Sequence, residues 1–170
     1  PYIHAVQSLA REIGEIFTTA IKLGRISRED LFSRVYTPVP NTNPEQVITP
    51  FTEFTDYVLP SLQEPMLRFS EKIIFCAAVN IDGYLPTHND KFSLPQRPND
   101  PDWNKSHCRN RRIFNDRVGL AAGQSKRPFL LQAYRRDMGN GQTVMMKDLS
   151  APIMVNGDHW GGIRLAYSVD

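Results

Sequence analysis

Three dipeptides of the Asp-Gly or Asn-Gly type punctuate the second half of the chain: Asp82-Gly83, Asn140-Gly141 and Asn156-Gly157. Each lies between apolar-rich runs. Such dipeptides are favoured where a two-residue turn needs positive φ at both central residues, because only Gly, Asn and Asp adopt that conformation at little cost. We therefore predict a compact antiparallel sheet over residues 73–167. A helical N-terminal third precedes it, so the expected fold class is α+β.

The composition is that of one globular domain. Of the 170 residues 41% are apolar and 22% are charged, enough to bury a core without disulfides or metals. The net charge of +2, without a basic stripe that carries interleaved aromatics, argues against a nucleic-acid partner. No run approaches the ~20 consecutive apolar residues of a membrane span. Because the chain opens without Met in a helical pattern and closes on a strand, we expect it to be a piece of a longer protein.

The first 23 residues carry a helical pattern that ends at Gly24. Apolar side chains recur at alternating steps of three and four, and Leu9, Ile16 and Leu23 add a second edge seven residues apart. The stripe is too wide for a two-helix seam alone, and two explanations stay open: one edge packs on the chain's own sheet while the other meets a partner helix, or the helix is amphipathic and buried on its own domain. The seam consists of Ile3, Val6, Ala10, Ile13, Phe17 and Ala20.

Shorter helices are expected between this helix and the sheet. Ser27 with Asp30 three residues later is typical of a helix N-cap. Two further helical pieces are predicted at 52–59 and 61–69. Residues 1–70 are thus expected to form a helical segment of the same domain as the sheet region, residues 71–170.

Four runs have strand character. Residues 73–80 are nearly all apolar, which predicts burial on both faces and a central place in the sheet. Residues 86–127 form a long polar insertion, of a length that is uncommon in a compact domain unless it is functional. Pro152 predicts a bulge or an edge, and Arg164 and Ala166 share one face of the last strand. The other runs are 129–136, 143–155 and 160–167.

Two groups of side chains offer hydrogen bonds to a small polar ligand. Tyr84 and His88 follow the Asp82-Gly83 turn, at the end of a strand. A turn with one satisfied histidine explains that pattern equally well. Arg112 lies in a short basic run and presents a planar fork of donors that suits carboxylates and phosphates. The alternative explanation is that Arg112 is simply exposed to solvent.

A third group flanks the Asn140-Gly141 turn. Tyr134 and Arg136 share a face of one strand, and Asp148 lies on the strand across the hairpin. The charged residues here either pair across the sheet or, together with Tyr134, reach a cavity on its concave face.

The sequence carries no enzymatic motif such as GxSxG, HExxH or a Gly-rich phosphate loop, so no enzyme is predicted. His88, His107, His159 and Cys108 match no common metal spacing, and no metal or other cofactor is predicted. CxxCH is absent, but a b-type haem on a single histidine leaves no sequence signature and stays open. Cys76 is expected to be a small buried hydrophobe, and a disulfide to Cys108 stays open.

Five long strings occur between Phe51 and the end of the chain: VLPSLQEPML, FCAAVNIDGYLPTHNDKFS, CRNRRIFNDRVGLAAG, PFLLQAYRRDMGNG and MMKDLSAPIMVNGDHWGGIRLAY. They resemble the extracytoplasmic sensor domain of bacterial methyl-accepting chemotaxis proteins, in the group with a single PAS-like Cache module. The resemblance covers roughly two thirds of the chain, and the N-terminal third matches in character only.

The resemblance implies a PAS-like sheet of about five strands, with a long N-terminal helix and short flanking helices. It implies the periplasmic portion of an inner-membrane receptor, anchored by a membrane helix on either side of the chain. It also implies dimer contacts through the N-terminal helix and a ligand pocket between the sheet and the 86–127 insertion. Some relatives attach c-type haem through CxxCH, which this sequence lacks.

On both grounds we expect a non-enzymatic chemoreceptor domain that binds a small carboxylate, amino acid or amine. Arg112 would pair with an acid group, Tyr134 would form an aromatic wall, and Asp148 would anchor an amine. The alternatives are a haem- or metal-binding redox or gas sensor, and a sensor of a periplasmic binding protein. The residues expected to bind the ligand are Tyr84, His88, Trp103, Arg112, Tyr134 and Asp148.

Overall fold

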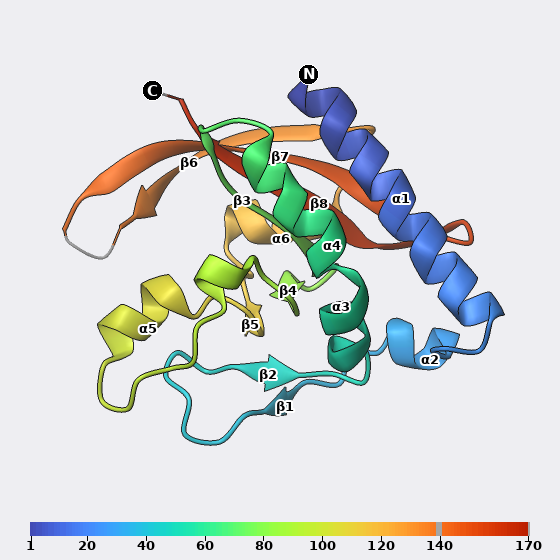
Figure 1. The fold of residues 1–170 in the computed structure, drawn as a ribbon, viewed down its shortest axis with the longest axis horizontal. Coiled ribbons are helices and arrows are strands. Elements are labelled where there is room, and N and C mark those ends of the chain that lie inside the picture. Colours follow the sequence, from blue (N-terminus) through green and yellow to red (C-terminus); the bar gives the residue numbers. More distant parts are fainter. Residues whose placement is uncertain (139–140, 170) are drawn as a thin grey trace.

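The computed structural model describes residues 1–138 and 141–169, so the Asn140 half of one predicted turn lies outside the described residues. The fold is α+β and is built on one antiparallel sheet in the order β3-β8-β7-β6 (Figure 1). Its strands are β3 (Ile73–Asn80), β6 (Leu130–Asp137), β7 (Thr143–Val155) and β8 (Asp158–Ser168).

This sheet has four strands among the described residues, where about five were expected. The turn at Gly83 forms, but the strand after it, β4 (Tyr84–Leu85), does not return along β3. It pairs instead with β5 (Arg112–Ile113) of the insertion. A second small pair joins β1 (Thr37–Pro38) to β2 (Val47–Ile48). The turn at Asn156-Gly157, where both residues have positive φ, joins β7 to β8 as predicted.

The long helix α1 (Tyr2–Lys22) packs across β7 and β8 (Figure 1). The predicted seam faces this sheet: five of its six residues are buried, while Ile3 at its start is exposed. The amphipathic explanation therefore accounts for the seam, and a dimer would have to use the outer side of α1. Among the described residues, no helix has the length and apolar character needed to cross a bilayer.

Short helices complete the covering of the sheet. Ser27 caps α2 by accepting the N–H of Asp30, as predicted. The helical pieces predicted at 52–59 and 61–69 are present, and the second is split by a change to 3₁₀ geometry. Helix α6 lies on the face of the sheet opposite α1. The short helices are α2 (Arg28–Leu31), α3 (Thr52–Val58), α4 (Pro60–Gln63), η1 (Glu64–Arg68), η2 (Asp90–Phe92), α5 (Pro101–His107) and α6 (Arg117–Gln124).

Strand β3 is buried on both faces as predicted, but it lies at the edge of the sheet and not at its centre. Two buried amide side chains take the place of a neighbouring strand. Gln63 Oε1 accepts the N–H of Ala78 at 2.9 Å, and Asn89 Oδ1 accepts the N–H of Cys76 at 2.8 Å. An edge strand whose outward N–H groups are satisfied in this way can be buried without a pairing partner.

Pro152 lies in the part of β7 that extends past Ser150, the residue that pairs with Leu130 at the start of β6. From there on β7 pairs with β8 alone, so the missing N–H of proline faces no neighbouring strand. The prediction of an edge at this position is confirmed.

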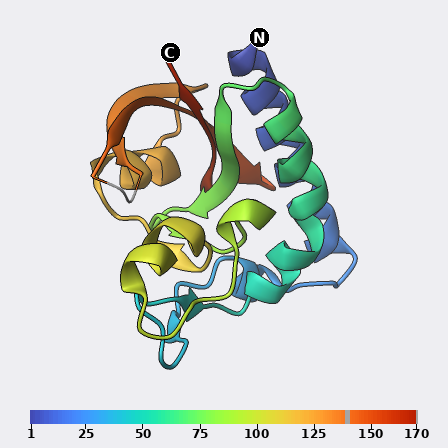
Figure 2. The same cartoon turned by 60° about the vertical axis from the view of Figure 1, so that its left-hand side comes forward.

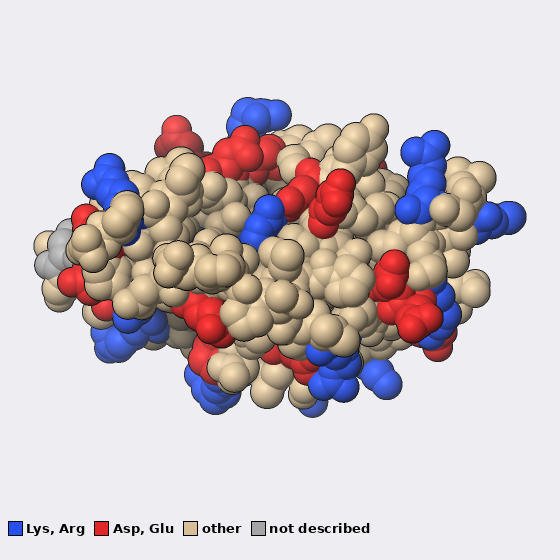
Figure 3. Space-filling view, turned by 90° about the horizontal axis from the view of Figure 1, so that it is seen from below, with Lys and Arg blue, Asp and Glu red and all other residues tan. Residues whose placement is uncertain are grey.

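Side-chain alternation divides the interior into two clusters on either side of the sheet. Ile163 and Leu165 of β8 face α1, whereas Ala166 belongs to the smaller cluster beneath the insertion. Figure 2 shows α1 on one side of the curved sheet and the insertion, with α5, on the other. On the surface seen in Figure 3, basic and acidic side chains are interspersed and do not gather into a patch of one sign.

Candidate functional site

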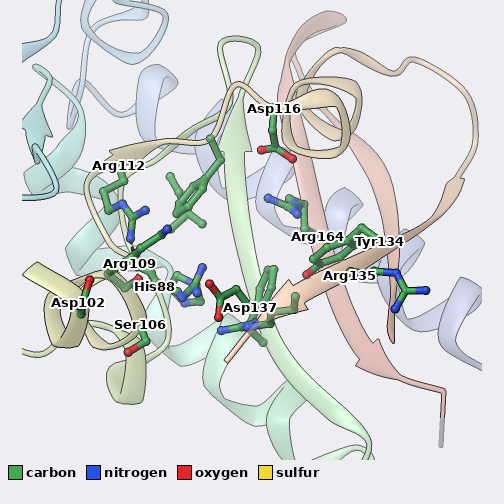
Figure 4. A pocket seen from close by; sticks show the side chains of 15 residues that line it. His88, Asp102, Ser106, Arg109, Arg112, Asp116, Tyr134, Arg135, Asp137 and Arg164 are labelled. Atoms are coloured by element: carbon green, nitrogen blue, oxygen red, sulfur yellow. Dashed lines mark hydrogen bonds between the residues drawn. The ribbon is translucent and has the colours of Figure 1, made fainter. Parts of the chain in front are cut away.

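A cavity of about 280 Å³ lies between the sheet and the 86–127 insertion, where a ligand pocket was expected. Strands β3, β6 and β8 supply one wall, and α5, β5 and the adjoining loops supply the other. Figure 4 shows the labelled side chains entering from both walls. The lining residues are Phe75, Leu85, His88, Asp102, Lys105, Ser106, Arg109, Arg112, Phe114, Asp116, Tyr134, Arg135, Arg136, Asp137 and Arg164.

Three of the six predicted ligand residues line this cavity: His88, Arg112 and Tyr134. They come from the segment after β4, from β5 and from β6. Tyr134 and Arg136 share the cavity face of β6, as the period-two alternation predicted. In Figure 4 the guanidinium of Arg135 points away from His88 and Arg109.

Tyr84 is buried in the core beneath α3 and does not line the cavity. Its hydroxyl donates to the carbonyl of Val47 at 2.8 Å and shares a hydrogen bond of the same length with Thr52. Burial raises the pKa of this phenol to about 12. Tyr84, which was predicted to bind a ligand, therefore lies outside this cavity, and its hydroxyl is already bonded within the fold.

Trp103 also lies outside the cavity lining. Its ring stacks on His107, with centroids 4.3 Å apart, and the guanidinium of Arg97 lies 3.7 Å from its centroid. The indole thus holds the loop before α5 against the helix, which is a structural role.

Asp148 is fully buried on the cavity side of β7, but it does not line the cavity. Arg164 of β8 lies between Asp148 and the cavity. Its Nε donates to Asp148 Oδ2 at 2.9 Å and its Nη2 lies 2.8 Å from the same oxygen. Burial raises the pKa of the Asp148 carboxyl and the Arg164 charge lowers it. This carboxylate already has a cation and cannot serve as the predicted amine anchor without losing it.

His88 is buried among aromatic rings at the base of the cavity. Its ring centroid lies 5.1 Å from that of Phe75 and 4.9 Å from that of Phe92. Burial, reinforced by the nearby arginines, holds the pKa of this imidazole well below its ordinary value. The imidazole is therefore neutral at pH 7. Because its Nδ1 accepts the N–H of Asn89 at 2.7 Å, the proton lies on Nε2, which makes Nε2 a donor.

Arg136 is the most buried cation of the lining together with Arg164, at 6% exposure each. Its guanidinium carbon lies 5.0 Å from the centroid of Phe92 and 5.5 Å from that of Phe75. Its Nη1 is buried and has no hydrogen-bond partner among the described residues. Burial lowers the pKa of Arg136, yet a guanidinium stays charged at neutral pH.

Arg109 and Arg112 approach from the insertion. Arg109 Nε is buried and, among residues 1–138 and 141–169, has no hydrogen-bond partner. Burial, together with the charges of Arg136 and Arg112, lowers the pKa of Arg109 to about 10. Arg112 is better satisfied: its Nη1 donates to the carbonyl of Lys105 at 3.0 Å and it lies over the ring of Phe114.

The acidic residues of the lining are placed differently. Asp102, Asp116 and Asp137 are all exposed, so they form the rim. The interior holds buried or half-buried arginines. The electrostatic character of the site therefore changes from mixed at the mouth to cationic inside.

Arg109, Arg136 and Arg164 were not among the predicted ligand residues. Arg164 and Arg136 could have been found, because alternation placed each on one defined face of a predicted strand. Arg109 belongs to the basic run 109–112, from which only Arg112 was chosen. Nothing in that run distinguishes the residue that turns inward.

A larger and more open hollow lies between the end of α1 and α3, with Ile16, Leu23, Phe54 and Tyr57 in its lining. Tyr57 is 83% exposed and the side chains here are largely at the surface. None of the residues that line this hollow carries a buried polar atom without a partner. The arginine cavity is the better candidate site for that reason.

Both cysteines are free and buried, as expected for Cys76, and the disulfide that was left open between Cys76 and Cys108 is not formed in this structure. Within the described part of the chain no cluster of three His, Cys, Asp or Glu side chains has a metal-binding arrangement. A scan against protein-family models and a search of curated proteins found no match for this chain.

Proposed function

We propose that this chain is the ligand-sensing domain of a membrane-anchored chemoreceptor, a non-enzymatic single-Cache module of PAS-like fold that faces the periplasm. The observation that carries the proposal is the course of β8. This one strand places Arg164 in the cavity and, three residues later, Tyr167 against the first turn of α1.

The contact at the far end of β8 is an aromatic one. The rings of Tyr2 and Tyr167 meet edge to face, with centroids 4.8 Å apart, and Tyr2 also packs on Phe69. The start of α1 and the end of β8 therefore lie together, at the same end of the molecule (Figures 1 and 2). Membrane helices joined to these two ends would enter the bilayer side by side.

The mechanism follows from a population shift. A ligand in the cavity contacts β8 and the insertion at once, so it stabilises the arrangement of the two walls that it bridges. A change in β8 reaches α1 through the Tyr2–Tyr167 contact and the core beneath the helix. In a homodimer the exposed surface of α1, with Ile3 exposed at its start and Leu23 exposed just after its end, would carry the change to the partner.

A b-type haem does not fit this cavity. About 280 Å³ is near the lower bound of small-molecule pockets, roughly 300–1,000 Å³, and is too small to enclose a macrocycle. His88 is moreover in contact with the rings of Phe75 and Phe92 and accepts a hydrogen bond at Nδ1.

The test is a thermal-shift screen of the purified chain against small metabolites, followed by hydrogen exchange on any hit. A ligand that binds the folded state alone raises the melting temperature. We expect a hit to slow exchange in β8 and in the insertion together. The proposal fails if no small molecule binds, or if the chain binds a periplasmic protein and no metabolite.

A further inference from the structure

We infer that the cavity selects a small anion, whose carboxylate or phosphate-type group is held between Arg109 and Arg136, and that it rejects amines. The inference rests on the proposed function, because it names the chemical class of the ligand at that same site. It narrows the expected range from carboxylates, amino acids and amines to anions.

The first step concerns how the arginines are held. Arg136 lies over Phe75 and Phe92, and Arg112 lies over Phe114. An aromatic ring attracts the face of a guanidinium and leaves the N–H edge free. These contacts therefore order the cations without occupying the donors that would bind an anion.

The second step concerns the donors left over. Arg136 Nη1 and Arg109 Nε are buried and have no hydrogen-bond partner among the described residues. A buried donor without a partner costs free energy, and a charged one costs more. They come from opposite walls, β6 and the insertion, and both line the same cavity. An anion between them would satisfy both and join the two walls.

The third step concerns charge. Of the lining cations, only Arg164 has a buried carboxylate partner within the part of the chain that the structure describes, and that partner is Asp148. Arg109 is surrounded by like charge: burial and the charges of three neighbouring arginines, Arg136, Arg112 and Arg164, lower its pKa. The interior is thus net positive. An ammonium group would add to this repulsion. Asp148, the fully buried carboxylate among the described residues near the cavity, binds Arg164 through Oδ2, and its Oδ1, which has no partner, belongs to a residue outside the cavity lining.

The fourth step concerns size and the third donor. A cavity of about 280 Å³ admits a molecule of a few carbon atoms and not a nucleotide. The neutral His88 offers Nε2–H from the base, and Tyr134 supplies a phenol in the wall. An acid group would therefore meet one neutral and two charged donors.

The experiment measures binding by calorimetry and thermal shift with named probes of matched size. The anions are acetate, succinate, inorganic phosphate and sulfate; the controls are ethylamine, putrescine and succinamide. We expect at least one anion to bind and the amines and amide not to. Arg109→Gln and Arg136→Gln should each weaken that anion about tenfold or more, because each removes a charge-assisted hydrogen bond. Arg127→Gln, an exposed arginine outside the lining, should leave binding unchanged.

A second measurement guards against misfolding. Arg136→Gln removes a buried charge that has no carboxylate partner among the ion pairs of the described residues. We therefore expect the melting temperature of the ligand-free variant to match or exceed that of the parent chain. A loss of binding with unchanged or raised stability supports the inference.

The outcomes separate the two proposals. Binding of carboxylates alone, or of phosphate alone, would identify the acid group of the ligand, and either result supports the inference. Binding of an amine or the amide in the cavity, with no anion bound, overturns the inference and leaves the sensing function standing. An anion that binds Arg109→Gln and Arg136→Gln as well as the parent chain is an adventitious ion only, and also overturns it. If no metabolite binds at all, both proposals fail.

Discussion

Replacing Gln63 by leucine tests whether side chains stand in for a missing strand beside β3. Gln63 is fully buried and uses both ends of its amide. Its Oε1 accepts the N–H of Ala78 at 2.9 Å, and its Nε2 donates to the carbonyl of Thr87 at 3.0 Å. Leucine has a similar size but can do neither, so Gln63→Leu leaves one buried N–H and one buried carbonyl without partners.

The expected cost follows from those two groups. Each buried backbone group left unsatisfied costs about 1–3 kcal/mol, so a loss of about 3 kcal/mol in the free energy of unfolding is expected. In a domain of this length about 1 kcal/mol moves the melting temperature by about 2–4 °C, which predicts a fall of about 6–12 °C.

Calorimetry or denaturant unfolding measures the loss, and hydrogen exchange locates it. The amide of Ala78 should exchange faster in the variant, while that of Cys76, which Asn89 holds, should change less. Gln7→Leu is the matched control, because its Nε2 makes an exposed hydrogen bond to Pro128, and it should change stability by no more than about 0.5 kcal/mol. If Gln63→Leu is no more destabilising than this control, the edge of β3 does not depend on the amide and the reasoning is wrong.

Three further predictions concern the packing and charges around the sheet. Gly14→Ala should destabilise the fold by about 1–2 kcal/mol despite the better helix propensity of alanine, because the new Cβ would lie 2.3 Å from the carbonyl oxygen of Met154; thermal unfolding measures this. Asp148→Asn should cost about 3 kcal/mol by leaving Arg164 without its counter-ion, and exchanging both residues for apolar ones should cost less; equilibrium unfolding of the single and double variants decides it. His88 has a lowered pKa when folded, so the unfolded chain binds its proton first and stability falls with falling pH: from about pH 7.5 to about pH 5.5 the loss is about 1.4 kcal/mol, and His88→Gln should remove that share of the slope in denaturant titrations.

The spacing of apolar residues predicted most of the helices and strands of the fold. The predicted strands 73–80 and 143–155 have the observed bounds, and the long helix was placed to within one residue at each end. The helix has one buried face, so its apolar residues recur at the period of the backbone, whereas β3 is buried on both faces and is nearly all apolar. The alternation along β8 likewise placed Arg164 opposite the helix-facing residues.

Pairing was harder to predict than burial. An all-apolar run indicates that both faces are covered, but it cannot say whether a strand or a side chain satisfies each edge. The edge partners of β3, Gln63 and Asn89, lie on opposite sides of it in the sequence and have no pattern of their own. The apolar seam of α1 likewise could not indicate what covers it, because a sheet and a partner helix both select apolar residues at steps of three and four.

Half of the residues predicted to bind a ligand line the cavity. Residue type indicates which interactions a side chain can make, but it does not indicate whether the side chain is already bonded within the fold. Tyr84 and Asp148 have the hydroxyl and carboxylate that a ligand would need, but Val47 and Arg164 use these groups within the fold. Their partners are distant in sequence, so only the structure separates engaged groups from open ones. The open donors, on Arg109 and Arg136, are those whose neighbours are mainly rings and other cations.

This difference between engaged and open arginines explains how one cavity can be both stable and responsive. Arg164 is fixed to β7 through Asp148, so the strand that leads to α1 keeps a charged group in the wall at a defined place. Under the proposed anion binding, the open donors of Arg109 and Arg136 would gain a hydrogen-bond partner when an anion bridges the insertion and β6, and the free energy released would favour the arrangement of the two walls that the anion bridges. Because Ile163 and Leu165 on the other face of β8 pack under α1, the strand cannot adjust to the ligand without altering its contact with that helix.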